Sequence, residues 1–166
     1  MLSYVALALV FLACAGTGAM LSRAMTLRAR ELELCLQMIA SLRAQLQFSR
    51  PPVERMLSGL CGQSQHPAFL PRCLADMRAG KAFPVAWAQA VEEQPAGLRE
   101  GDRRHLLALG ELLGASDAAG QREALQLQET LLATQLEQAR TQRDTRGKAF
   151  FMLGILAGLT VMILFI

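Results

Sequence analysis

The sequence predicts an all-α protein: an antiparallel bundle of about six helices, of which the first and last continue as transmembrane helices. The chain is 52% apolar but only 5% aromatic, and good helix formers dominate, while β-branched residues are scarce outside the two ends. All 17 Lys and Arg and all 14 Asp and Glu lie between Arg23 and Lys148, so both ends are uncharged. We therefore expect transmembrane helices at residues 1–21 and 149–166 and one cytoplasmic helical bundle at residues 22–148.

The first apolar segment, residues 2–21, reads LSYVALALVFLACAGTGAML. At ~1.5 Å per residue this length spans a hydrocarbon core of ~30 Å. A cleaved signal peptide needs a positively charged start, and the first four residues carry no basic side chain. A lipoprotein signal around Cys14 is disfavoured for the same reason, because it also needs a positively charged start. The segment is therefore interpreted as a transmembrane helix.

The second apolar segment, residues 149–166, has just the length needed to cross. Gly154 and Gly158 form a small-xxx-small pair, which predicts close approach of another membrane helix. The flanking charges set the orientation, because cytoplasmic loops are rich in Lys and Arg; this predicts a cytoplasmic domain and two outward-facing termini. The flanking cations are Arg23, Arg28, Arg30, Arg140, Arg143, Arg146 and Lys148.

The first helix is predicted to leave the membrane and continue to about Phe48. Its apolar residues recur at three- and four-residue steps, which gives one apolar stripe. Proline and glycine then divide the middle of the chain, because proline suits the first turn of a helix and glycine its end. Trp87 is predicted to be a core anchor. The stripe consists of Cys35, Met38, Ile39, Leu42 and Leu46, and the short helices are predicted at residues 52–60, 67–80 and 83–94.

Two further helices complete the predicted bundle. Asp102 is a plausible N-cap for a fifth helix that runs through Leu113 and stops at Gly114. Ser116 and Asp117 are predicted to cap the last helix, which is expected to continue from about residue 118 into the membrane. Its predicted buried face carries Leu125, Leu132, Leu136 and Ala139.

The search for chemistry yields no catalytic, cofactor-binding or metal-binding residue, so we expect a protein that is not an enzyme. A phosphate-binding loop needs a glycine-rich run before a lysine, and no such run is present. Cys61, His66 and Cys73 match no paired-cysteine spacing, so helix-packing thiols are favoured over a metal site. His105 is more typical of a surface residue than of a catalytic one. The formal charge of +3 is too mild to indicate nucleic acid.

One family resemblance covers nearly the whole chain. It rests mainly on Leu109-Gly110, Leu113-Gly114-Ala115-Ser116-Asp117 and Gln121. These residues resemble the LG…LG.SD…Q signature of the stage III sporulation protein AB family. Residues 153–159 (LGILAGL) resemble that family's closing membrane helix. The match at residues 42–57 is looser, with Gln45 and Phe48 where the family usually has Glu and Tyr.

The resemblance implies a role that the residues alone do not give. The family resembles the cytoplasmic helical domain of type II secretion F proteins. The resemblance implies that this protein is a scaffold in the channel-like complex that joins mother cell and forespore. It further implies that the protein lies in the mother-cell (outer forespore) membrane. Implied partners are a companion cytoplasmic ATPase and other membrane subunits. We expect Ser116 and Asp117 to form the cap and corner of the last helix, with Gly110 and Gly114 allowing close packing there; a purely structural cap is the alternative.

Other functions stay open at this point. The main alternative is a platform subunit of a type II secretion or pilus-like system unrelated to sporulation. A membrane-anchored enzyme or regulator is disfavoured by the missing site, and a small channel or holin would pass ions when expressed alone. Self-association of the bundle is also open.

Overall fold

The structure is a computed structural model that describes residues 2–48, 52–94, 96–114, 118–147, 149, 152, 153, 155, 156, 160 and 163. Side chains at 2–12, 14, 15, 47, 48, 118–124, 146 and 147 lie outside this description. Within it the regular structure is helical throughout, which confirms the predicted all-helical bundle. The helices are α1 (Leu2–Phe48), α2 (Val53–Cys61), α3 (Leu70–Arg78), α4 (Phe83–Glu93), α5 (Glu100–Gly114), α6 (Ala118–Gln142) and a π-helix, η1 (Arg143–Gly147).

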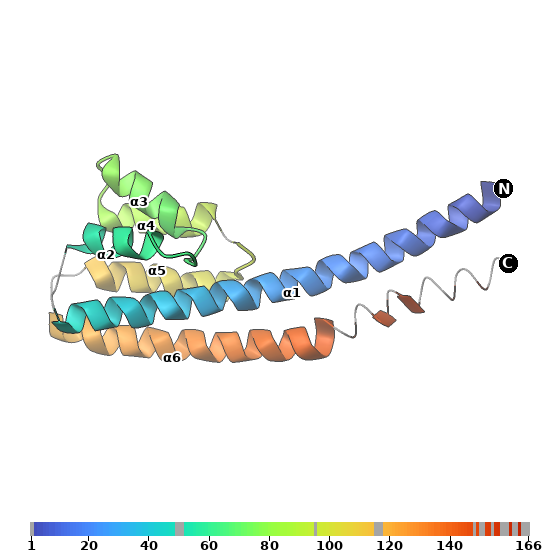
Figure 1. The fold of residues 1–166 in the computed structure, drawn as a ribbon. Helices are drawn as coiled ribbons and strands as arrows, with labels where there is room; N and C mark the ends of the chain where they lie inside the picture. The colour runs from blue at the N-terminus through green and yellow to red at the C-terminus, as the bar shows by residue number, and fades with distance from the viewer. Residues whose placement is uncertain are drawn as a thin grey trace. The chain divides into compact units, whose positions relative to one another are not determined.

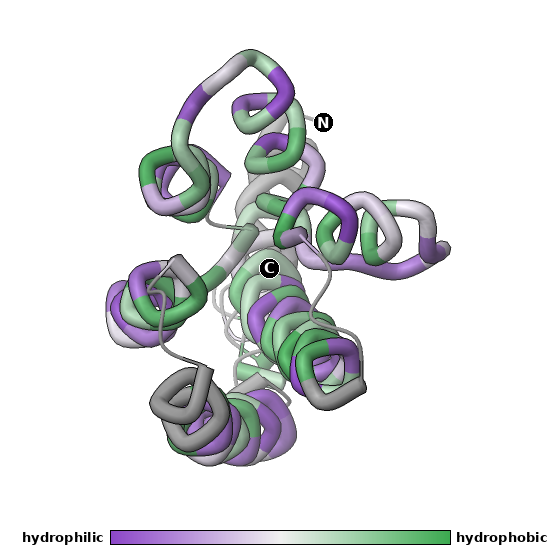
Figure 2. Tube along the Cα trace, turned by 90° about the vertical axis from the view of Figure 1, so that its left-hand side faces the viewer, coloured by the Kyte–Doolittle hydropathy of each residue, from purple (hydrophilic) through white to green (hydrophobic). Residues whose placement is uncertain are grey.

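The chain forms two compact units. Unit 1 comprises Met1–Ala29 and Gln138–Ile166, and unit 2 comprises Arg30–Glu137. In unit 2, α6 runs back along α1, and α2–α5 gather above these two helices in the view of Figure 1. An ion pair between Arg43 Nη1 and Glu129 Oε2, at 2.7 Å, joins α1 to α6. Hydrophilic and hydrophobic residues alternate along the helices in Figure 2, as expected for amphipathic helices around a shared core.

The helical periodicity correctly predicted the buried faces of the two long helices. On α1, Cys35, Met38, Ile39 and Leu42 are buried, while Leu46 is half-buried. On α6 the predicted face is buried at Leu125, Leu132, Leu136 and Ala139. These residues recur at about one helical turn, so a single face of each helix is removed from water.

Two predicted helix starts were wrong. The third helix begins at Leu70, because residues 67–69 form a turn in which the Leu70 N–H donates to the Pro67 carbonyl at 3.1 Å. The fifth helix begins at Glu100, so Asp102 is its third residue and not its N-cap. From there Asp102 Oδ2 accepts the backbone N–H of Arg99 at 2.9 Å. A carboxylate at the third helical position can accept a hydrogen bond from the backbone N–H just before the helix. An N-cap side chain does the same for a backbone N–H inside the helix.

The last helix is not one continuous α-helix through residue 147, which corrects a further prediction. At Arg143 it changes to a π-helix that ends at Gly147. In a π-helix each hydrogen bond spans five residues, so the turn is wider than in the α-helix before it. Among the described residues, no helix combines the length and the apolar character that a membrane crossing requires.

Candidate functional site

The contact between α4 and α5 is centred on Trp87. Phe83 and Pro84 open α4 after the extended residue Ala82, and this start directs Trp87 towards α5. Trp87 is fully buried, and its Nε1–H donates to the Leu106 carbonyl at 2.7 Å. The Phe69 ring meets the Trp87 ring edge-on, with centroids 5.0 Å apart. The sequence-based prediction of a core anchor is confirmed.

Two glycines on α5 lie against α4. A Cβ at Gly110 would lie 2.2 Å from Trp87 Cδ1, and one at Gly114 would lie 2.8 Å from Pro84 Cγ. Positions four apart share one face of a helix, so the pair forms a small-residue strip along α5. The close approach that these glycines permit is therefore to α4.

A polar network ties α3 to α4 beside this contact. Asp76 on α3 is only 8% exposed and lies 3.3 Å from both Arg72 Nε and Lys81 Nζ. Arg72 also reaches Glu93 on α4 at 3.3 Å. Lys81 donates to Gln89 on α4 at 2.7 Å. The two helices are thus held by charge pairs as well as by their apolar faces.

A cleft of about 490 Å³ opens between the end of α4 and the start of α5. Glu92 comes from α4, and the other lining residues come from α5: Glu100, Arg103, Arg104 and Leu107. Glu100 and Arg104 form an ion pair with each other. Glu92 and Arg103, by contrast, have no side-chain partner among the described residues. The cleft therefore presents one acidic and one basic group beside the half-buried Leu107.

On the α1 side, buried Glu31 holds the loop between α2 and α3. Its Oε1 accepts the Ala68 N–H at 2.5 Å, a contact across 37 residues of chain. Burial raises the pKa of Glu31, and the Ala68 hydrogen bond and the charges of His66 and Arg30 oppose that rise only in part. The carboxylate form is therefore disfavoured at this position.

The described thiols are shifted away from the reactive thiolate form. Burial, followed by the negative charges of Glu31 and Asp102, raises the pKa of Cys35. Burial, followed by Cys61 and Asp76, raises the pKa of Cys73 to about 12. No group of three His, Cys, Asp or Glu side chains arranged to hold a metal occurs in the described part of the chain.

The chain matches the family described as "Stage III sporulation protein AB" over residues 3–166. It belongs to the stage III sporulation protein AB family. Membership implies a role in sporulation. A solved structure titled "Stage III sporulation protein AB (SpoIIIAB)" is similar to this fold, with a TM-score of 0.65 and 19% sequence identity. The match covers 72% of this chain and 98% of that one. A search of the curated proteins finds no match.

The signature residues of this stage III sporulation protein AB family member fall in three places. Gly110 and Gly114 lie on α5 against α4. Gln121 belongs to α6, but its side chain is outside the description. Ser116, Asp117, Gly154 and Gly158 lie outside the described residues, so the predicted corner and the predicted membrane packing stay predictions.

Sequence reasoning missed the cleft of this family member entirely. Glu92 and Arg103 are eleven positions apart on different helices, separated by the turn around residues 96–99. Charged residues at helix ends usually form solvated faces, so no local pattern distinguishes these two. Only the packing of α4 on α5 brings them to one hollow.

Proposed function

We propose that this protein is a non-enzymatic, membrane-anchored scaffold of the channel-like complex that joins mother cell and forespore. Its family membership, with the implied role in sporulation, supports the biological setting. The observation that carries the scaffold role is the α4–α5 cleft, where Glu92 and Arg103 have no side-chain partner among the described residues. A pair of opposite charges on two packed helices suits recognition of a protein surface more than catalysis.

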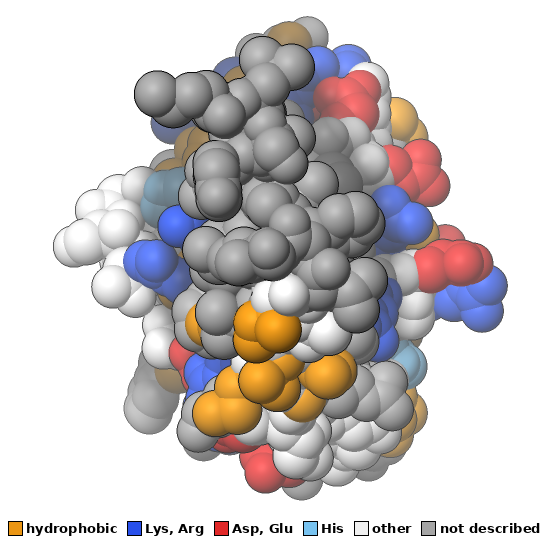
Figure 3. Space-filling model, turned by 90° about the vertical axis from the view of Figure 1, so that its right-hand side faces the viewer, with side chains coloured by type: hydrophobic (Ala, Val, Ile, Leu, Met, Phe, Trp, Pro, Cys, Tyr) orange, Lys and Arg blue, Asp and Glu red, His pale blue; other side chains and the backbone are white. Residues whose placement is uncertain are grey.

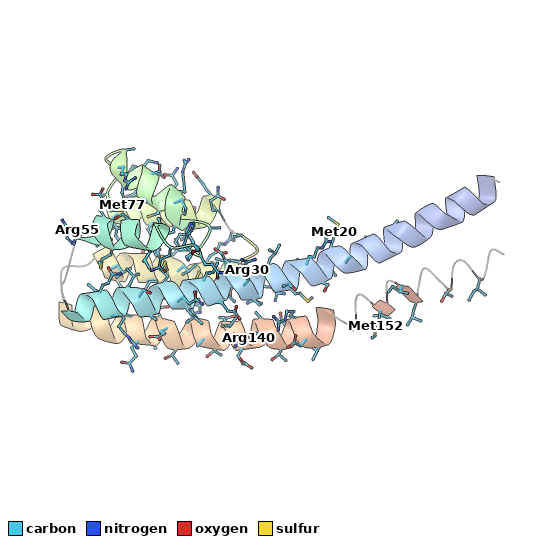
Figure 4. The ribbon with its side chains drawn as sticks, viewed as in Figure 1. Met20, Arg30, Arg55, Met77, Arg140 and Met152 are labelled. Carbon is cyan, nitrogen blue, oxygen red and sulfur yellow. The ribbon has the colours of Figure 1, made fainter. Side chains whose placement is uncertain are left out.

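The distribution of exposed apolar side chains supports the membrane anchor. Nine large hydrophobic residues are exposed among those described, and seven of them belong to unit 1. Soluble surfaces rarely gather apolar side chains in this way. In Figure 4, Met20 projects from α1 and Met152 from the C-terminal segment. The seven residues are Met20, Leu21, Leu27, Met152, Leu153, Leu156 and Ile163.

In this proposal the orientation rests on the charges and the compartment rests on the family resemblance. Cations flank the inner end of each apolar segment, as in cytoplasmic loops of membrane proteins. The helical bundle between the two apolar segments, here called the head, then faces the mother-cell cytoplasm from the outer forespore membrane. Other membrane subunits would meet the second span at Gly154 and Gly158.

The proposed partner at the head is the companion cytoplasmic ATPase. A cleft of about 490 Å³ has the size of a binding pocket and accepts a few side chains of a partner. The partner would place a base opposite Glu92, an acid opposite Arg103 and an apolar group against Leu107. Movement of the ATPase would then be passed through the packed helices to subunits in the membrane.

The test is a pull-down of the full chain in neutral detergent with the companion ATPase from the same genome. We expect Glu92→Arg and Arg103→Glu each to weaken binding at least about tenfold, because each places like charges in contact. Glu54→Arg makes the same charge change as Glu92→Arg at an exposed position on α2; it is the control and should bind normally. An Asp117→Ala variant tests the predicted corner separately.

The outcomes separate the parts of the proposal. If the folded wild-type chain does not bind, the companion ATPase is excluded as its partner. If all variants bind alike, the ATPase remains the partner, but it does not bind at the α4–α5 cleft. The alternative, a platform for secretion or pili without sporulation, is favoured by no specific observation; a gene deletion that leaves spore formation intact would revive it.

A further inference from the structure

Charge divides unequally between the two units. Unit 1 contains six basic residues and one acidic residue, a net charge of +5. Unit 2 contains eleven basic and thirteen acidic residues, a net charge of −2. The excess cations therefore belong to the unit that also holds seven of the nine exposed large hydrophobic residues described. Figure 3 shows a patch of hydrophobic side chains on the face towards the chain ends.

Within unit 1, a side-chain hydrogen bond joins the two helices. Arg28 on α1 is buried, and its Nη1 donates to Gln142 Oε1 on α6 at 3.4 Å. Arg28 therefore has a structural role in joining the helices. Arg23 on α1 and Arg140 on α6 are exposed. Arg140 and Arg143 also interact within the chain, and Arg143 lies 3.0 Å from Asp144.

The exposed cations form a band of limited height. The two helices run in opposite directions in Figure 1. Arg23 lies five residues from Arg28, about 7.5 Å along the helix, and Arg140 lies two residues from Gln142, about 3 Å the other way. The band is thus roughly 10 Å high, comparable with one lipid head-group layer of roughly 5–8 Å.

We propose that Arg23 and Arg140 bind the phosphates of anionic lipid head groups, so that this end of the bundle selects anionic over zwitterionic lipid. The inference rests on the membrane anchor in the proposed function and goes beyond it. The orientation rule needs these cations only during insertion, whereas head-group binding needs them in the finished protein. Each cation near an anionic surface adds about a fivefold preference.

The experiment is native mass spectrometry of the full chain in neutral detergent. Phosphatidylglycerol and phosphatidylcholine with identical acyl chains are added in equal amounts. We expect several-fold more phosphatidylglycerol adducts on the wild type, and an adduct ratio near one for Arg23→Gln/Arg140→Gln. Arg55→Gln/Arg78→Gln removes the same charge from exposed positions of unit 2 and should keep the wild-type ratio. Circular dichroism checks that all three chains are folded.

Four results would overturn the inference. They are an equal adduct ratio in the wild type, an unchanged lipid preference in Arg23→Gln/Arg140→Gln, an equal fall in the control pair, and displacement of the lipid by millimolar inorganic phosphate. If Arg23→Gln/Arg140→Gln keeps its lipid preference but loses the ATPase in the pull-down, the cations serve an acidic protein surface instead. Flotation of the full chain with pure phosphatidylcholine vesicles reports the anchor alone. Flotation without head-group preference removes only this inference, whereas failure to float removes the proposed anchor as well.

Discussion

Trp87 on α4 occupies the space that a side chain at Gly110 on α5 would need. A Cβ at Gly110 would lie 2.2 Å from Trp87 Cδ1 and 2.7 Å from Trp87 Nε1. The same Nε1–H donates to the carbonyl of Leu106, one turn earlier on α5. The indole thus lies directly on the backbone of α5, and the glycine makes that approach possible.

Gly110→Ala should therefore destabilise the protein. Alanine favours a helix over glycine by about 1 kcal/mol, but overpacking a core costs about 1–3 kcal/mol, and the Trp87 ring has no flexible end that can move aside. The net loss in the free energy of unfolding, up to about 2 kcal/mol, is measured by urea denaturation. Gly59→Ala, in α2 with nothing within 4 Å, is the matched control and should gain stability. Equal gains in both variants would show that Trp87 does not constrain Gly110.

Glu31→Gln should change how stability depends on pH. The folded-state pKa of Glu31 lies above its ordinary value of 4.5, mainly because of burial. Its contribution to stability is therefore fully present below pH 4.5 and is lost as pH rises through the folded-state pKa. Glutamine keeps an oxygen for the Ala68 N–H without the charge. The stability of Glu31→Gln relative to wild type should rise between about pH 4 and pH 8.

Thermal unfolding at a series of pH values measures this difference. Glu54→Gln, at an exposed position of α2, serves as the control. A difference between Glu31→Gln and wild type that is constant across the range would show that burial does not penalise the carboxylate.

Gln128→Met should stabilise the protein. Gln128 is 8% exposed, and its Oε1 has no hydrogen-bond partner among the described atoms. An unsatisfied buried acceptor costs about 1–3 kcal/mol, which methionine of similar size removes. The gain is measured by urea denaturation. Gln126→Met, exposed on the same helix, should change stability by less than about 0.5 kcal/mol. A loss at Gln128 would indicate that the amide has a partner in solution.

Cys73 should react far more slowly than Cys61 with iodoacetamide. Only the thiolate reacts, and a pKa of about 12 leaves a thiolate fraction of about one in ten thousand at pH 8. Burial also raises the pKa of Cys61, but that side chain is only half-buried. Peptide mapping of the alkylated folded chain gives the two rates, and denatured chain is the control, where both should react alike. Faster labelling of Cys73 would contradict the described burial.

The sequence by itself determined the helical class, most helix boundaries and the buried faces of the long helices. The stripe at Cys35, Met38, Ile39 and Leu42 could be predicted because a helix brings positions three and four apart to one face, whatever surrounds it. Trp87 was predictable for a related reason, since a large ring among alanines has most to gain from burial. These are local effects, and local residues are enough to determine them.

Only the tertiary structure decided what the individual groups contact. Gly110 was noticed as part of a signature, but its partner Trp87 lies 23 positions away on another helix. The Glu31–Ala68 hydrogen bond and the cleft between Glu92 and Arg103 depend in the same way on how short helices stack. Even the start of α5 differed from its prediction, because Asp102 can accept the backbone N–H of Arg99 from inside the helix. Short helices gain most of their stability from packing, so their contacts are determined by the whole bundle and not by their own residues.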